Sequence, residues 1–215
     1  MLDEVGVEQG YIVLQNYLTP DDIAPLLRGT VLERYEFVDE DLIMLRDRLV
    51  AEAHARTPVQ PDAGAVGTVP IDHHFNVRGI GTVILGSVVR GGIRKHDTLK
   101  VYPGEQTVTV RSIQKHDDDF DWAAEGDRAG LALKNIESDD LDRGFVLSSD
   151  PEIQARTNFE VGADLVKYWP APLTAGMVLH IGHWMQFIPA RLEAVRDDGD
   201  WRRPTLTLAL EKDLV

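Results

Sequence analysis

The sequence has no cysteine, few aromatic residues and no long apolar run. Without cysteine, disulfides, thiolate zinc sites and cysteine nucleophiles are all excluded. No apolar stretch approaches the roughly 18 residues needed to cross a bilayer, and the first residues are acidic where a secretory signal would be basic. We therefore expect a soluble, cytoplasmic protein without a membrane partner.

The motifs of common nucleotide-binding and hydrolytic sites are also missing. The phosphate-binding loop is absent, and Gly79 and Gly81 lack the third glycine and the helix that a dinucleotide site requires. No Gly-x-Ser-x-Gly elbow occurs. His180 and His183, if they lie on one strand, point to opposite faces and do not share a metal. Local chemistry thus indicates a binding protein, with no cofactor or metal held by this chain.

Charge is distributed unevenly along the 215 residues. The whole chain has a net charge of −14, yet residues 76–115 hold seven basic and two acidic side chains. We call the seven the basic island: Arg78, Arg90, Arg94, Lys95, Lys100, Arg111 and Lys115. Such a run is either an ordinary solvated face or a local surface for an anionic ligand.

The first 56 residues have the pattern of α/β structure. A strand is expected over residues 10–14, followed by a helix that Thr19 caps, a second strand-like piece over 31–38, and a helix capped by Asp39 or Asp41. This segment is too short for a complete doubly wound domain. Residues 57–68, with two prolines and no apolar periodicity, are the predicted linker.

Beyond the linker the pattern changes to short β segments. These are expected at residues 81–89, 97–102, 107–113, 129–136 and 144–148, and Val108 and Val110 alternate with polar neighbours. This spacing predicts a small β-barrel over residues 69–150. Residues 151–215 offer about four more strands, which predicts a second, incomplete barrel. Its unpaired edges could join a second copy or a partner chain. The predicted fold is therefore mainly β, after a small α/β remnant at residues 1–56.

The barrel segment carries a spaced set of residues that resembles the opening of domain II in translational GTPases of the elongation factor Tu and SelB type: Phe75, Val77, Gly79, Gly81, Thr82, Val83, Gly86, Val88 and Gly91. The same frame continues in order through residues 97–101, 110–114, 126–136 and 141–147. Residues 178–184 and 189–193 are similar to domain III of the SelB-like factors.

The resemblance implies a surface that binds the aminoacylated 3′ end of tRNA. Val77, Val83 and Leu133 would form its apolar floor, and Gly79 and Gly81 would leave backbone amides open. Gln114 would meet the terminal adenosine, where elongation factor Tu has a carboxylate. Arg78 and Lys115 lie beside these positions. The implied partners are aminoacyl-tRNA and the ribosome.

The first segment is similar to the last third of the GTPase domain in a divergent archaeal branch of this superfamily. Residues 10–22 fall where the guanine-binding Asn-Lys-x-Asp motif would lie. Within them, residues 14–20 keep Asn16 as the one match, since the lysine and aspartate are missing. The phosphate loop and the magnesium-binding segments do not occur in these residues either. We therefore expect no GTP hydrolysis by these residues alone.

Three functional hypotheses follow. The first is an elongation factor-like protein that binds aminoacyl-tRNA through the barrel, without its own complete GTPase core. The second is one part of a split GTPase, in which GTP and Mg²⁺ are held by a core on another chain. The third is a protein-interaction barrel that is no longer used in translation, because one barrel fold hosts several functions.

Overall fold

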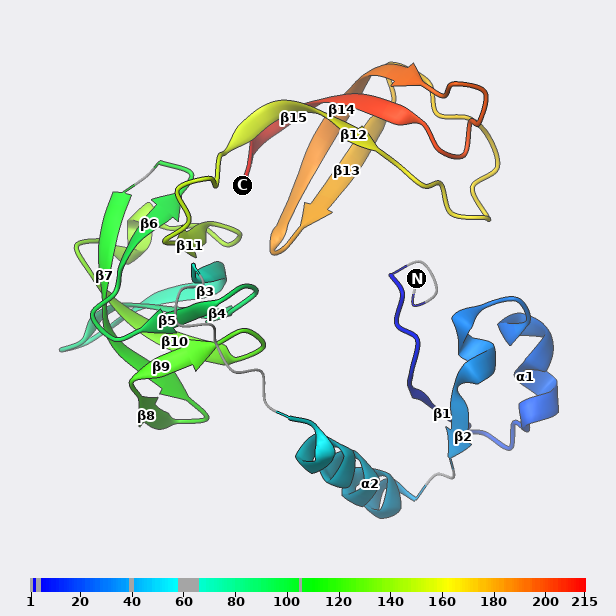
Figure 1. Ribbon diagram of the computed structural model, residues 1–215, viewed down its shortest axis with the longest axis horizontal. Helices are drawn as coiled ribbons and strands as arrows, with labels where there is room; N and C mark the ends of the chain where they lie inside the picture. Colours follow the sequence, from blue (N-terminus) through cyan, green and yellow to red (C-terminus); the bar gives the residue numbers. More distant parts are fainter. Residues whose placement is uncertain (1, 3–4, 39–40, 58–65, 105) are drawn as a thin grey trace. The chain divides into compact units, whose positions relative to one another are not determined.

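A computed structural model describes residue 2 and residues 5–38, 41–57, 66–104 and 106–215. The chain forms two compact units, Met1–Pro58 and Val59–Val215, and is mainly β, as predicted (Figure 1). Within the described residues, no helix is both long and apolar enough to cross a bilayer. Residues 58–65 of the predicted linker lie outside the described part, and Thr68 at its end is already the first residue of a strand.

The first unit contains a two-stranded parallel sheet and two helices. Strand β1 (Tyr11–Val13) pairs with β2 (Glu36–Val38), and α1 (Pro20–Leu27) and a 3₁₀ helix, η1 (Val31–Arg34), lie between them in the chain. The prediction of a strand over residues 31–38 was thus wrong for its first half. The Thr30 hydroxyl accepts a hydrogen bond from the Leu32 amide, which starts the 3₁₀ turn instead.

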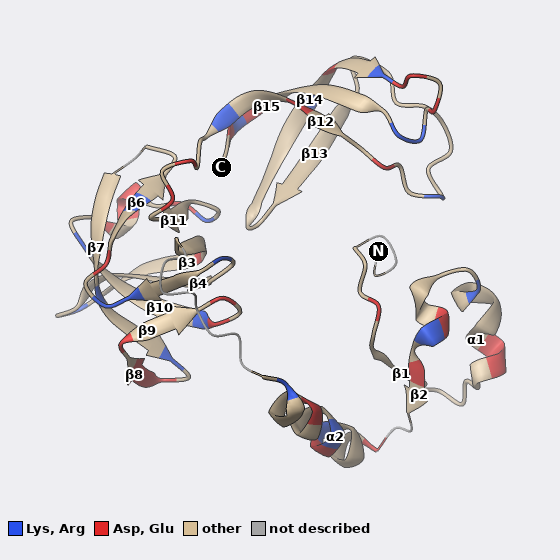
Figure 2. Ribbon diagram, viewed as in Figure 1, with Lys and Arg blue, Asp and Glu red and all other residues tan. Residues whose placement is uncertain are grey.

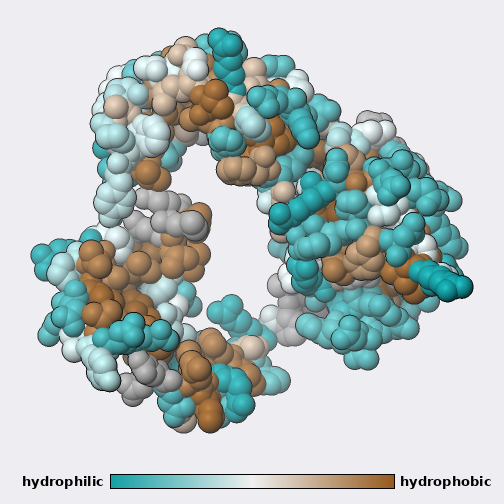
Figure 3. Space-filling model, turned by 180° about the vertical axis from the view of Figure 1, so that it is seen from behind, coloured by the Kyte–Doolittle hydropathy of each residue, from teal (hydrophilic) through white to brown (hydrophobic). Residues whose placement is uncertain are grey.

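Helix α2 (Leu42–Ala55) begins at Asp41, whose carboxylate caps the amides of Ile43 and Met44. The second predicted cap, Asp39, lies outside the described residues. None of the helix's 14 residues is buried. Its large apolar side chains are exposed: Leu42, Ile43, Met44, Leu49 and Val50. Figure 3 shows hydrophobic surface over this helix. These five side chains are 47–70% exposed, so no described residue buries them.

The second unit begins with a closed barrel of six strands. They are β3 (Thr68–Val77), β4 (Gly81–Ser87), β6 (Thr98–Tyr102), β7 (Gln106–Lys115), β10 (Arg128–Lys134) and β11 (Val146–Ser148). Their order around the barrel is β10, β4, β3, β11, β6 and β7, and a direct pairing of β7 with β10 closes the circle (Figure 1). Closure leaves these strands without a bare edge.

Shorter elements surround the barrel. Strand β8 (Asp118–Phe120) continues from β7 as a hairpin, β5 (Gly92–Arg94) pairs with β9 (Trp122–Ala124), and η2 (Ser138–Asp140) follows β10. The interior is filled by inward residues of the barrel strands, among them Ile84, Leu131 and Val110. Val108 and Val110 are fully buried while Arg111 is exposed, so the predicted alternation is confirmed.

A four-stranded antiparallel sheet follows in the order β12 (Arg156–Gly162), β15 (Thr205–Leu214), β14 (Gln186–Arg196) and β13 (Val178–His183). Alternate residues of these strands, such as Ala190, Leu192 and Leu208, form a separate apolar core. The four described strands do not close into a circle, in line with the predicted incomplete barrel.

Candidate functional site

The outer face of β3, β4, β10 and β7 contains several of the residues that were predicted to bind a ligand. Residues opposite each other on antiparallel strands share a face, so the strand register arranges the outward side chains in rows. One row consists of Phe75, Val83, Ala132 and Ser112, and the next consists of His73, Leu85, Gly130 and Gln114. The residues between these rows, such as Ile84, Leu131 and Ile113, point into the core.

The middle of this face is a strip of very small side chains. Gly130 and Ala132 lie on β10 between the larger residues of β4 and β7. A Cβ atom added to Gly130 would lie 3.4 Å from Leu85 Cδ2 and 3.9 Å from the Gln114 carbonyl oxygen. The small residues of β10 therefore lie between an apolar edge on β4 and a polar edge on β7, with Gly130 half-buried and Ala132 4% exposed. This arrangement suits a flat ligand with one apolar face and a polar rim.

The structure places five of the eight predicted residues at one end of this face. Val77 and Gly81 are opposite each other where β3 turns into β4, Val83 is two residues further along, and Arg78 and Gly79 form the turn. Gly79 and Gly81 have φ angles of +83° and +98°, which favour glycine. Gln114 on β7 lies on the same face, in the row that also contains Gly130 on β10 and Leu85 on β4.

A hydrogen bond from a β-bulge in β7 links that strand to the β3–β4 turn. The register of β7 against β10 shifts between Ala132 and Leu133, so Arg111 has no direct partner on β10. The Arg111 guanidinium donates to the carbonyl oxygen of Ile80 in the β3–β4 turn, at 2.9 Å. This residue of the basic island therefore lies beside the turn that contains Arg78. Arg111 was predicted only as a member of the basic island, and its contact with the β3–β4 turn was not predicted.

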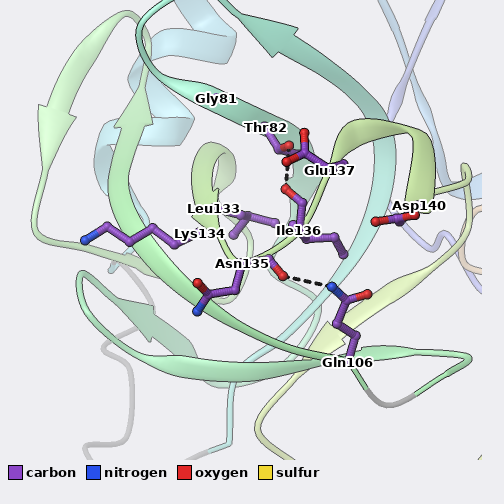
Figure 4. A pocket seen from close by; sticks show the side chains of 9 residues that line it. All are labelled: Gly81, Thr82, Gln106, Leu133, Lys134, Asn135, Ile136, Glu137 and Asp140. Carbon is purple, nitrogen blue, oxygen red and sulfur yellow. Dashed lines mark hydrogen bonds between the residues drawn. The ribbon is translucent and has the colours of Figure 1, made fainter.

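Leu133 does not lie on the outer face. It is opposite Val110, is 3% exposed and belongs to the barrel core. The expected place in the apolar floor was therefore wrong, because the alternation along β10 turns Ala132 outward and Leu133 inward. Leu133 instead helps to line a hollow of about 520 Å³ at the end of the barrel (Figure 4). In this hollow, Gln106 Nε2 donates a hydrogen bond to the Asn135 carbonyl oxygen at 2.8 Å.

Lys115 also differs from its expected role. Its side chain is only 12% exposed, and Nζ lies 2.9 Å from an Asp127 carboxylate oxygen. The same Nζ lies 4.3 Å and 4.9 Å from the ring centres of Phe120 and Trp122. Burial alone would raise the pKa of Asp127, but its hydrogen bonds to the Ala124 amide and Lys115, together with nearby positive charge, hold that pKa below its usual value. Lys115 therefore anchors the β7–β8 hairpin and is not displayed to a ligand.

Lys115→Met should lower the free energy of unfolding by about 1–3 kcal/mol, because it removes a charged hydrogen bond and two cation–π contacts together. The measurement is a urea unfolding curve. Lys134→Met, at an exposed position of β10, is the matched control and should change stability little. Equal curves for the two variants would contradict an anchoring role.

The basic island does not form one surface. Arg78 lies in the β3–β4 turn and Lys100 on β6, and Arg90 forms an ion pair with the largely buried Asp150 at 3.0 Å. Figure 2 shows basic and acidic segments interspersed around the barrel. The net charge of residues 76–115 therefore overstates the charge that any single ligand would meet. On the candidate face itself, Arg78 and Arg111 are the exposed members of the island.

A cluster that sequence analysis missed lies at the other end of the face. Asp72, with a side chain only 12% exposed, is 3.0 Å from Arg128, 3.2 Å from Arg143 and 3.2 Å from His73. Burial would raise the pKa of Asp72, but the Arg128 hydrogen bond and the surrounding positive charges lower it overall. Three basic groups thus share one carboxylate. No local sequence signal could have revealed this, since Asp72, Arg128 and Arg143 are far apart in the chain.

The lowered pKa of Asp72 predicts a loss of stability in acid. The unfolded chain binds a proton near pH 4, the ordinary value for aspartate, before the folded chain does. Stability from this group is therefore complete above that pH and is lost as the pH falls through the lower folded pKa. Urea midpoints measured from pH 5 to pH 2.5 should fall less steeply for Asp72→Asn than for the wild type. Asp118→Asn, on the exposed strand β8, should keep the wild-type slope.

Comparison with known proteins assigns the barrel to a family. The family model for Elongation factor Tu domain 2 matches residues 81–148. An uncharacterized protein of Methanocaldococcus jannaschii is 33% identical over 213 residues, which is 99% of this chain and 65% of that protein. The selenocysteine-specific elongation factor of the same organism is 31% identical over 135 residues, covering 62% of this chain and 29% of that factor.

Solved structures show the same fold. Translation elongation factor SelB from Methanococcus maripaludis, in its apo form, has a TM-score of 0.77 at 20% identity over 96% of this chain and 51% of that one. A bacterial selenocysteine-specific elongation factor has a TM-score of 0.72 at 16% identity, with 35% of its chain covered. The chain thus spans less than two thirds of each of these proteins. Together, these matches show that the chain belongs to the elongation factor Tu/SelB-like superfamily and corresponds to its C-terminal part.

Proposed function

We propose that the outer face of β3, β4, β10 and β7 binds the aminoacylated 3′ end of a tRNA. The observation that carries this proposal is the strand register, which gathers Val77, Val83 and Gln114 from separate strands onto one surface. The small residues Gly130 and Ala132 leave room for a flat nucleoside between them. Membership of a superfamily that includes selenocysteine-specific elongation factors supports the same ligand class.

The charges of this face are consistent with such a ligand. Arg78 and Arg111 lie at one end, and Arg128, Arg143 and His73 surround Asp72 at the other. Phosphates of the terminal nucleotides would meet positive charge at both ends, while the ring of the terminal base would lie over the apolar residues. The chain's net charge of −14 disfavours non-specific binding to nucleic acid.

The proposal is tested by protection of the aminoacyl ester. Spontaneous hydrolysis of aminoacyl-tRNA at low salt should be markedly slower with this protein than with the same concentration of albumin. The double variant Arg78→Ala with Gln114→Ala should lose the protection, whereas Arg94→Ala, on the separate β5–β9 sheet, should retain it. Protection equal to that of albumin would overturn the proposal.

A second candidate, one part of a split GTPase, is favoured by the first unit. Its parallel pair β1–β2 has only two strands, and α2 exposes five large apolar side chains. Parallel sheets are normally covered on both faces. The exposed apolar surface of this unit is therefore what would be expected if further parts of an α/β domain packed against it. GTP and Mg²⁺ would then be held by residues outside these 215. Titration with a fluorescent GTP analogue, with and without a candidate partner chain, separates the two candidates.

A further inference from the structure

Asp119 is the direct neighbour of Gln114 across the β7–β8 hairpin. The two residues are opposite each other in the register, so their side chains share the outer face. The hairpin turns through His116 and Asp117, whose φ angles are +53° and +67°. A two-residue turn with both φ angles positive is the tightest hairpin connection and fixes the register of its strands. Asp119 is therefore held beside Gln114 by the backbone.

The contact between these side chains determines how the amide is oriented. Gln114 Nε2 lies 3.0 Å from Asp119 Oδ1. A carboxylate only accepts hydrogen bonds, so the Gln114 amide must turn its NH₂ group towards Asp119. The opposite orientation would bring two oxygen atoms together. Among the described residues, none donates a hydrogen bond to the remaining Gln114 oxygen, Oε1.

The hairpin that carries Asp119 is itself anchored. Lys115 precedes the turn, and its ammonium group is held by Asp127 and by the ring of Phe120, the last residue of β8. Asp119 lies between the turn and Phe120, so both of its flanks are fixed. This arrangement gives the predicted residue Lys115 an indirect part in the site.

We infer that Asp119 orients the Gln114 amide so that the outer face presents a carbonyl oxygen, which selects a ligand that donates a hydrogen bond at this point. The inference rests on the proposed function. The terminal adenosine of a tRNA offers two such donors, a ribose hydroxyl and the exocyclic amine. Asp119 is thus a positioning residue, and it gives a neutral glutamine the acceptor character of a carboxylate.

The test uses three tRNAs that carry an amide-linked amino acid, which does not hydrolyse. The first has an unmodified terminal adenosine, the second lacks its free ribose hydroxyl, and the third has purine in place of adenine and so lacks the amine. Dissociation constants are measured for the full chain at low salt. The wild type should bind one of the two altered RNAs about 5- to 10-fold more weakly, as expected for one lost hydrogen bond.

Variants at Asp119 separate positioning from a structural role. Asp119→Ala should bind all three RNAs with nearly equal affinity, because the Gln114 amide is then free to rotate and to present either its oxygen or its NH₂ group. Asp119→Asn keeps an acceptor oxygen for Gln114 Nε2 and should restore most of the discrimination. Asp118→Ala removes the same charge from the neighbouring residue and should discriminate like the wild type.

Each outcome decides a separate point. Discrimination that persists in Asp119→Ala, or that is missing from the wild type while the unmodified RNA binds tightly, would overturn the inference and leave the proposed function intact. Failure of the wild type to bind any of the three RNAs at low salt would overturn the proposed function and the inference with it.

Discussion

Gly130→Leu should weaken binding of aminoacyl-tRNA by about 100-fold while leaving the barrel folded. The new side chain would project outward from β10, between Leu85 and Gln114, and occupy the space proposed for the terminal nucleoside. A ligand raised by the thickness of a side chain loses its contact with the apolar edge and its hydrogen bond to Gln114. Together these are worth about 2–3 kcal/mol, which corresponds to a factor of roughly 30 to 150.

The fold should tolerate this change because the backbone of Gly130 has no need of glycine. Its φ angle lies outside the left-handed region, and an added Cβ atom would make an ordinary contact of 3.4 Å with Leu85. Gly130→Ala is the matched control and should keep most of the affinity. Gly86 is a useful contrast, since a Cβ atom there would lie 2.4 Å from the Pro70 carbonyl oxygen and Gly86→Ala should disrupt the barrel.

The measurements are a dissociation constant by fluorescence anisotropy and a thermal unfolding curve for each variant. Loss of binding with an unchanged unfolding midpoint would support the outer face as the site. If Gly130→Leu bound as tightly as the wild type, the terminal nucleoside could not lie over β10.

The sequence predicted the barrel because its signals are local. Alternating valines define the inward face of β7, and Gly79 and Gly81 mark the β3–β4 turn. Both patterns involve residues that are only a few positions apart in the sequence. In the structure, Val77, Gly81 and Val83 of the domain II pattern lie close together at the start of the β3–β4 pair.

The remaining features depend on contacts between distant residues. The bulge at Arg111 determines which β10 residues are opposite each β7 residue, and it leaves no trace in the sequence of β10 itself. Lys115 is basic whether it faces solvent or Asp127, so a count of charges cannot assign its role. The cluster around Asp72 joins three segments that only the closed barrel brings together.

Leu133→Ala should separate the core from the binding face, because it should lower the stability of the barrel strongly while leaving that face unchanged. Leu133 is 3% exposed and packs inside the barrel opposite Val110. Removing a buried leucine side chain costs about 2–5 kcal/mol, through lost apolar burial and the cavity that remains. Because the side chain points away from the outer face, molecules that stay folded should bind RNA with nearly wild-type affinity.

Val83→Ala provides the opposite case, since Val83 is half-buried on the outer face beside Ala132. It should cost less than about 1.5 kcal/mol of stability yet weaken RNA binding. Urea unfolding and anisotropy at low temperature measure both quantities for each variant. The reverse pattern, with Leu133→Ala stable but defective in binding, would mean that Leu133 belongs to the apolar floor. It would also contradict the β7–β10 register on which the proposed site depends.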